Sequence, residues 1–448
     1  MMSQSSRGES VAVDRVLDAV DRLKDELIES LSAAVRIPSV NPKYPGEVYD
    51  EVVGGEGEVS RYMAALYERI GCTVDLFAVE PRRENAVGVL KGTGGGRSLI
   101  FNGHVDVVPV GDPASWMSGD PFSGRVDAGR VWGRGSTDMK GGVMAQAYAA
   151  KAIRDAGLRL QGDLILEAVV GEEMMDHECG TTATLRRGYT ADAAVVSEPS
   201  APPDPLAVVP ITPGTWAFSV TVTGKSTHSS MRGQTFRAGG LGAEVGVSAI
   251  DKGWYLFQAI RQLEDEWGQS KKHPLFAPGH FTISPGAVVG GPRGVQGIGF
   301  VPAYMTTEYV CWYHPDDDPA QVRQEIERHI ARAAELDPWL RLHPPTVEWT
   351  LNWPASRVDP AHPICQAVQA AHEIAAAGTR FAGPPPIRGF AAVEDTSFLN
   401  LGGVPAISYG PGDIRVAHAD DEFILIDELV TACRTYAVLA VTWCGVEA

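Results

Sequence analysis

The sequence lacks the cysteine patterns that mark a zinc ribbon, a redox motif or a disulfide scaffold. Its 448 residues include six cysteines, and no two of them form a Cys-x-x-Cys pair. Isolated cysteines of this kind are typical of buried free thiols in a reducing compartment. We therefore expect neither a structural zinc ribbon nor a thioredoxin-type centre.

Long apolar runs and a basic excess are absent too. No uninterrupted apolar stretch reaches about 18 residues, so we expect no membrane span. Residues 1–30 are polar and then amphipathic, without the apolar core of a signal peptide. Acidic residues outnumber basic ones by 56 to 38, and the net charge of −18 disfavours binding to nucleic acid or anionic membranes. These absences predict a cytoplasmic protein.

What is present is an alternation of short apolar runs with helical patterns. Predicted strands at 98–102, 163–170 and 192–196 each end in a polar cluster, and a helix is expected at about 139–156, opened by Asp138. This order predicts an α/β fold whose mixed, largely parallel sheet is flanked by helices.

The pattern changes to half-exposed strands after residue 213 and returns to the α/β type near residue 353. We expect a catalytic domain formed by residues 1–213 and 353–448. Residues 214–352 are expected to form a smaller inserted α+β domain of β-α-β-β-α-β order.

Clustered histidines and carboxylates follow the predicted strands directly. In open α/β sheets, ligands bind beyond the carboxyl ends of the strands, so these residues could meet although they are far apart in the chain. Two imidazoles and four carboxylates require cations to sit together, and zinc accepts such nitrogen and oxygen ligands. A simpler role remains open for single members, since Asp138 could be only a helix N-cap. The six residues are His104, Asp138, Glu172, Glu173, Glu198 and His418.

Several sequence blocks lie around these residues and together span most of the chain. They are Gly103-His-Val-Asp-Val-Val-Pro-Val, Asp120-Pro-Phe, Gly133-Arg-Gly-Ser-Thr-Asp-Met-Lys-Gly-Gly, Gly171-Glu-Glu, Ser197-Glu-Pro and Ala417-His-Ala-Asp-Asp-Glu. These blocks resemble one enzyme family, the di-zinc aminoacylase/carboxypeptidases, which includes acetylornithine deacetylase, succinyl-diaminopimelate desuccinylase and glutamate carboxypeptidase.

The resemblance implies a role for each strand-end residue. His104 and Glu198 would bind one zinc ion, Glu173 and His418 the other, and Asp138 would bridge both. Cobalt or manganese could replace zinc at such a site.

Three further catalytic roles follow from the same resemblance. Glu172 would be the general base that takes a proton from the attacking water. Asp106 would fix the tautomer of His104. His228 would stabilise the tetrahedral oxyanion from the partner subunit of a homodimer that forms through the inserted lid domain.

The chain departs from the family at the substrate carboxylate. Relatives that cleave N-acyl amino acids usually carry an Asn before the lid turn and an Arg on the following strand. Here the turn reads Gly299-Phe-Val-Pro302, and the strand 309–315 contains no Arg. Arg293, Arg357 or Arg388 could replace the missing clamp, or the substrate has no carboxylate there. The pair Glu394-Asp395 could instead receive an amine.

We therefore expect a di-zinc hydrolase that cleaves the amide bond of a small N-acetylated, N-formylated or N-succinylated amine or amino acid. A dipeptidase or metallocarboxypeptidase is the alternative among enzymes. A non-catalytic metal-binding homologue and a protein with one structural zinc are alternatives of other classes. The sequence leaves the acyl group and the native metal open.

Overall fold

The computed structural model of the protein describes residues 4–200 and 203–447. Residues 1–3, 201–202 and 448 lie outside the described residues. All of them fall within the predicted catalytic domain, residues 1–213 and 353–448. The chain forms two compact units. Unit 1 comprises Met1–Ile211, Ser356–Arg388 and Glu394–Ala448, and unit 2 comprises Thr212–Ala355 and Gly389–Val393.

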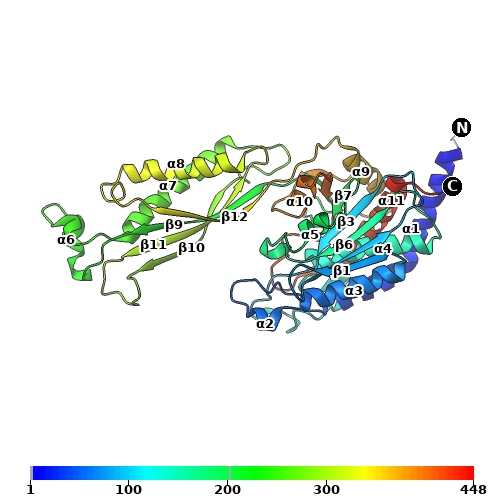
Figure 1. Ribbon diagram of the computed structural model, residues 1–448, viewed down its shortest axis with the longest axis horizontal. Helices are drawn as coiled ribbons and strands as arrows, with labels where there is room; N and C mark the ends of the chain where they lie inside the picture. The colour runs from blue at the N-terminus through cyan, green and yellow to red at the C-terminus, as the bar shows by residue number, and fades with distance from the viewer. Residues whose placement is uncertain (1–3, 201–202, 448) are drawn as a thin grey trace. The chain divides into compact units, whose positions relative to one another are not determined.

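Unit 1 is built on an eight-stranded mixed sheet with the order β1-β2-β6-β3-β7-β14-β8-β13 (Figure 1). Its central pairs β6–β3, β3–β7 and β7–β14 are parallel, whereas β1–β2, β2–β6 and β14–β8 are antiparallel. The predicted α/β fold with a mixed sheet is confirmed. The strands are β1 (Thr73–Ala78), β2 (Glu84–Leu90), β3 (Leu99–His104), β6 (Leu164–Val169), β7 (Ala194–Val196), β8 (Val208–Ile211), β13 (Ile387–Gly389) and β14 (Ala406–Ser408).

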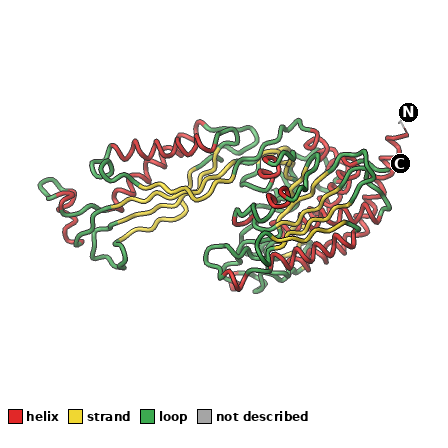
Figure 2. Tube along the Cα trace, in the orientation of Figure 1, coloured by secondary structure: helices red, strands yellow, loops and turns green. Residues whose placement is uncertain are grey.

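Helices cover both faces of this sheet. Consecutive residues of a strand point to opposite faces. Phe101 of β3 packs on Tyr436 of α11, whereas Asn102 donates to Thr181 of α5, so α11 and α5 lie on opposite faces. Helices α1, α4 and α9 pack with α11, and α10 packs with α5 (Figure 2). The bounds are α1 (Gln4–Val35), α3 (Gly55–Ile70), α4 (Gly141–Asp155), α5 (Thr181–Arg186), α9 (Pro363–Ala375), α10 (Thr396–Leu401) and α11 (Ile426–Cys444).

The core explains the apolar character of these elements. Strands β3, β6 and β7 are buried along their whole length, as expected for parallel strands covered on both faces. All six cysteines are buried free thiols, as predicted. None of the helices within residues 4–200 and 203–447 combines the length and apolarity needed to cross a membrane.

Unit 2 contains a four-stranded antiparallel sheet of order β10-β11-β9-β12. The chain order is β9 (Gly214–Thr223), α7 (Ala249–Ser270), β10 (Ile283–Gly291), β11 (Tyr304–Tyr313), α8 (Pro319–Glu335) and β12 (Thr346–Trp353), which is the β-α-β-β-α-β order. Alternate residues of β9 face its core. Phe218, Val220 and Val222 are buried in one cluster with Leu256 of α7 and Ile326 of α8.

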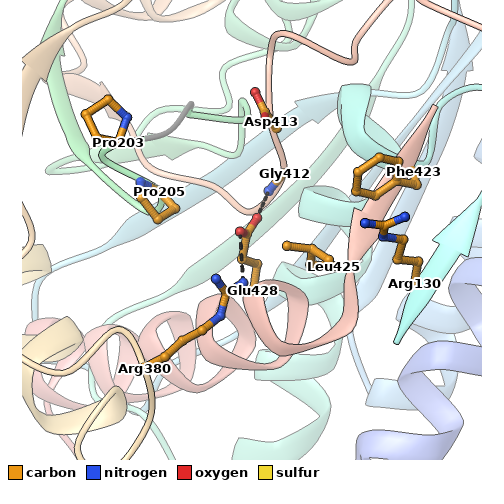
Figure 3. Close-up of a pocket in the computed structure, with 9 residues that line it drawn as sticks. All are labelled: Arg130, Pro203, Pro205, Arg380, Gly412, Asp413, Phe423, Leu425 and Glu428. Atoms are coloured by element: carbon orange, nitrogen blue, oxygen red, sulfur yellow. Dashed lines mark hydrogen bonds and ion pairs between the residues drawn. The ribbon is translucent and has the colours of Figure 1, made fainter. Parts of the chain in front are cut away.

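A small cavity of about 290 Å³ in unit 1 lies beside the segment that leads to His418 (Figure 3). Glu428, in the first turn of α11, is 5% exposed and accepts a hydrogen bond from Gly412 N at 3.1 Å. Arg380 Nη2 lies 3.4 Å from the same carboxylate. Burial raises the pKa of Glu428 to about 7 even though Gly412 and Arg380 lower it. This buried carboxyl therefore ties α11 to the segment preceding His418.

We predict that Glu428→Gln removes a pH-dependent loss of stability. The folded pKa of about 7 lies above the ordinary value of 4.5, so the folded state binds more protons between these values and its stability falls as pH rises. The free energy of unfolding of the variant minus that of the wild type should increase by roughly 2 kcal/mol from about pH 5 to about pH 8. Urea denaturation with a chelator present measures this difference. Asp14→Asn, at an exposed carboxylate of α1, is the control, and a pH-independent difference for Glu428→Gln would contradict the prediction.

Candidate metal centre

The six strand-end residues come together at one edge of the unit 1 sheet. His104 is the last residue of β3, and Glu172 and Glu198 follow β6 and β7 closely. Because these three strands are parallel neighbours, their carboxyl ends lie at the same edge. The ligand atoms of His104, Glu172 and Glu198 lie within 4.8 Å of one another, as do those of His104, Asp138 and Glu173.

Asp138 lies between the two histidines. Its Oδ1 is 3.2 Å from His104 Nε2, and its Oδ2 is 3.3 Å from His418 Nε2. His104 Nε2 also faces Glu198 Oε1 at 3.3 Å, and His418 Nε2 faces Glu173 Oε2 at 3.0 Å. Each carboxylate oxygen of Asp138 is therefore directed at a different histidine–glutamate pair.

The observed start of the helix excludes the simple N-cap role of Asp138. The predicted helix at 139–156 is observed as α4 from Gly141, with Lys140 as its N-cap. Asp138 itself has φ −124° and ψ 97°, which are not helical angles. The expected helix start was two residues too early, because Asp138 and Met139 do not have helical angles and Asp138 is directed into the cluster.

The donor set fits divalent cations. Glu173 Oε1 is buried and has no hydrogen-bond partner in the described structure, and His104 Nε2 is buried and makes no hydrogen bond of normal geometry although carboxylate oxygens lie 3.2 and 3.3 Å away. Buried polar atoms are normally satisfied, so both atoms indicate a ligand between these side chains. Imidazole nitrogens and carboxylate oxygens are the donors that zinc and related metals bind. Within the cluster, His104, Glu198, Asp138, Glu173 and His418 could hold such ions.

Electrostatics of the cluster without cations support the same interpretation. Burial raises the pKa of Glu172 well above its ordinary value and raises the pKa values of Glu173 and Glu198 to about 7. Burial alone would lower the pKa of His418, but Asp138 and Glu173 outweigh it and raise that pKa to about 11. Protons thus neutralise the cluster when no metal does, and bound metal would replace them.

Asp106 contacts the loop that carries the two glutamates. Its Oδ1 accepts from Gly171 N at 2.9 Å and its Oδ2 from Glu173 N at 3.1 Å. The Nδ1 of His104 lies 3.0 Å from the backbone carbonyl of Asp106, whereas the nearer carboxylate oxygen is 3.7 Å away. The residue therefore meets the imidazole through its backbone, and its side chain holds the glutamate loop.

Two residues near the cluster have roles that sequence reasoning did not assign. Glu422 is fully buried and accepts from Thr137 N at 2.9 Å and from Asp138 N at 3.2 Å, while Arg134 Nη1 donates to it at 2.7 Å. The same guanidinium donates to Ala419 O at 3.2 Å. Both residues belong to matching sequence blocks, but only the fold shows that they join the Asp138 and His418 segments.

The candidate substrate residues are dispersed. His228 lies in unit 2, is exposed, and accepts from Ser230 N at 3.2 Å. The guanidinium of Arg293 lies over the Tyr304 ring, also in unit 2. In unit 1, Arg388 pairs with Asp204 at 2.7 Å, and Arg357 forms a backbone bridge with Ile211.

The acidic pair Glu394 and Asp395 lies beneath the surface. The two residues are 0% and 2% exposed, so an amine would reach them only by displacing the atoms that cover them. Thr396 donates to Glu394 at 2.8 Å, and burial raises the pKa of Asp395 to about 6. The charge of Asp395 contributes to the raised pKa of Glu172, so the two carboxylates repel each other.

Comparisons with known proteins agree with this site. The family model described as peptidase family M20/M25/M40 matches residues 100–442. Relatives named N-formyl-4-amino-5-aminomethyl-2-methylpyrimidine deformylase come from Halalkalibacterium halodurans and Bacillus subtilis. The first is 32% identical over 443 residues, covering 96% of this chain and 97% of the relative. The second is 33% identical over 403 residues, covering 86% and 89%.

A solved structure shares the architecture. The M20 family metallo-carboxypeptidase Sso-CP2 from Sulfolobus solfataricus has a TM-score of 0.67 and 18% identity, over 93% of this chain and 98% of its own. Identity this low shows the fold alone, but the family match and the deformylase relatives each cover most of the chain. The chain therefore belongs to peptidase family M20/M25/M40, a family of metal-dependent hydrolases, and the family resemblance of its sequence blocks is confirmed.

Proposed function

We propose that this protein is a di-zinc deformylase that hydrolyses the amide bond of a small N-formylated amine, with an N-formyl aminomethylpyrimidine as the leading substrate. The observation that carries the proposal is the 32% identity to a deformylase of that substrate over 96% of the chain. Six free cysteines favour a reducing compartment, and we propose the cytoplasm.

The missing carboxylate clamp supports the same substrate class. A formylated aminomethylpyrimidine has no carboxylate for an Asn and Arg pair to bind. Strand β11 (Tyr304–Tyr313) contains no Arg, and the turn before it reads Gly299-Phe-Val-Pro302. A substrate without a carboxylate accounts for both departures, and no substitute from Arg293, Arg357 or Arg388 is then required.

We assign the ligands as the sequence blocks imply. His104 and Glu198 would hold one cation, Glu173 and His418 the other, and Asp138 would bridge them. The cations would lower the pKa of a coordinated water and polarise the amide carbonyl. Glu172, directed at His104 Nε2 from 3.8 Å, would take the proton of the attacking water and deliver it to the leaving nitrogen.

We propose that unit 1 is the catalytic domain and unit 2 the lid and dimerisation domain. Strand β10 is an edge of the unit 2 sheet, and its Val288 and Val289 are each 55% exposed. Ile250 and Trp254, one turn apart on α7, are 43% and 55% exposed, and Ile250 lies beside β10. An unprotected apolar edge strand favours pairing with a second copy. His228 from that copy would bind the oxyanion.

A substrate pair that differs only in one carboxylate tests the substrate class. We predict that N-formylbenzylamine has a kcat/KM at least about tenfold above that of N-formylphenylglycine, because a desolvated carboxylate without a partner costs binding energy. The formylated aminomethylpyrimidine should exceed both, and N-acetylornithine, N-succinyl-diaminopimelate and dipeptides should react poorly. Chromatographic product analysis measures each rate. Preference for a dipeptide would instead support the peptidase alternative.

Replacing the proposed base separates catalysis from metal binding. Glu172→Gln should lower kcat by about 10²–10⁴-fold, because the amide cannot accept the water proton. Metal content per chain, measured by mass spectrometry, should stay at the wild-type value. Glu178→Gln, at an exposed glutamate paired with Arg186, is the matched control and should retain activity. Wild-type turnover in Glu172→Gln would refute the assigned base.

A charge on the exposed apolar surface tests the dimer. Trp254→Glu combined with Val288→Lys should convert the dimer to a monomer in sedimentation velocity, and turnover should fall with it because His228 acts across the interface. Leu336→Glu alters an 81% exposed leucine at the end of α8 and should leave the dimer intact. A dimeric double variant, or a fully active monomer, would contradict this arrangement.

A further inference from the structure

The loop that carries Glu172 and Glu173 is a tight turn, residues 171–176. We call it the ring, because a backbone hydrogen bond joins its two ends. It begins at Gly171, whose φ of 92° lies in the left-handed region. Asp176 N donates to Gly171 O at 2.7 Å and closes the ring, and Met175 N donates to Glu172 O inside it. A ring this short transmits any shift of Asp176 to both glutamates.

The side chain of Asp176 is held by two positively charged side chains from outside the loop. Arg83 Nη1 and Lys43 Nζ each lie 2.7 Å from Asp176 Oδ2. Arg83 is fully buried and is itself fixed by a two-pronged pair with Glu56, at 2.6 and 2.9 Å. Such bidentate pairs fix the guanidinium plane, so Asp176 is bound by a rigid donor.

Asn85, two residues after Arg83, binds both ends of a slightly longer segment. Its Oδ1 accepts from Val170 N at 3.1 Å, and its Nδ2 donates to Cys179 O at 2.7 Å. Arg83, which precedes β2, and Asn85, its second residue, thus hold the segment 170–179 before, within and after the ring. We call these two residues the loop anchor.

A metal site is a second interpretation of the acidic groups beside the anchor. Glu80, Asp176 and Cys179 have ligand atoms close enough to share an ion. Both carboxylates are already paired, however, with Lys43 and Arg83 at 2.5–3.0 Å. Burial raises the pKa of the Cys179 thiol to about 12, which disfavours the thiolate that metals bind. The arrangement is therefore an ion-pair network that positions the loop.

We propose that Arg83, acting through Asp176, is a positioning residue for the catalytic loop, which sets Glu172 for proton transfer and Glu173 for binding one of the two cations. This inference rests on the proposed function for its catalytic part. Asp106 holds the near side of the ring at Gly171 and Glu173, and Arg83 holds the far side at Asp176. Loss of the Arg83 contact should therefore loosen the loop without displacing His104 or Glu198.

The test compares Asp176→Asn and Arg83→Lys with the wild-type protein. Asparagine keeps the size of the side chain and the backbone bond that closes the ring, but it loses the charge pairing. Asp163→Asn is the matched control, because Asp163 pairs with Lys91 at 2.6 Å and precedes β6, whereas the loop follows β6. The readouts are kcat and KM for a formamide substrate, thermal unfolding, and Co²⁺ titration of the metal-free protein followed by visible absorption.

We expect Asp176→Asn to lower kcat about tenfold or more and to weaken the second Co²⁺ equivalent about tenfold, with KM and the first equivalent unchanged. Arg83→Lys should show the same asymmetry, and Asp163→Asn should show neither effect. Unchanged kcat and Co²⁺ binding in both variants would overturn the inference. An equal loss of both equivalents that follows a lower unfolding temperature would also overturn it, because it indicates a structural role only. Failure of the wild type to hydrolyse any amide would refute the proposed function, whereas the Co²⁺ comparison would still test the anchor.

Discussion

Four carboxylates crowded at the end of a buried sheet are the constraint on which this structure depends. Asp138 and Glu198 are nearly inaccessible to solvent, and Glu172 and Glu173 adjoin them, so their mutual repulsion is poorly screened. Protons or cations must neutralise them, and the histidines at 104 and 418 supply only part of the balance. We propose that two divalent cations supply the rest.

Buried polar contacts hold the segments that carry these groups. Asp106 binds the glutamate loop, the Glu422–Arg134 pair joins the Asp138 and His418 segments, and Arg83 fixes the far side of the loop. Buried ion pairs contribute little net stability, since desolvation offsets their attraction. In this protein they position the residues that would bind metal, because such residues must be held in the right geometry before the metal binds.

The sequence predicted the candidate metal ligands better than the residues that hold those ligands in place. His104 and Glu198 could be placed because strand ends are visible in apolar runs, and parallel strands bring their ends together. The contact between Arg83 and Asp176 spans 93 positions, and no local pattern encodes such a pairing. The start of α4 was misplaced by two residues, because Asp138 and Met139 have non-helical angles that no local sequence pattern indicates.

A zinc titration of the metal-free protein tests the central claim most directly. In a weakly buffered solution near neutral pH, the same experiment counts the equivalents of zinc bound and the protons released. The account predicts that two equivalents bind per chain and that protons leave the ligand residues as the metal enters, since metal replaces them. Binding of a single equivalent, or binding without proton release, would contradict a cluster built for two cations.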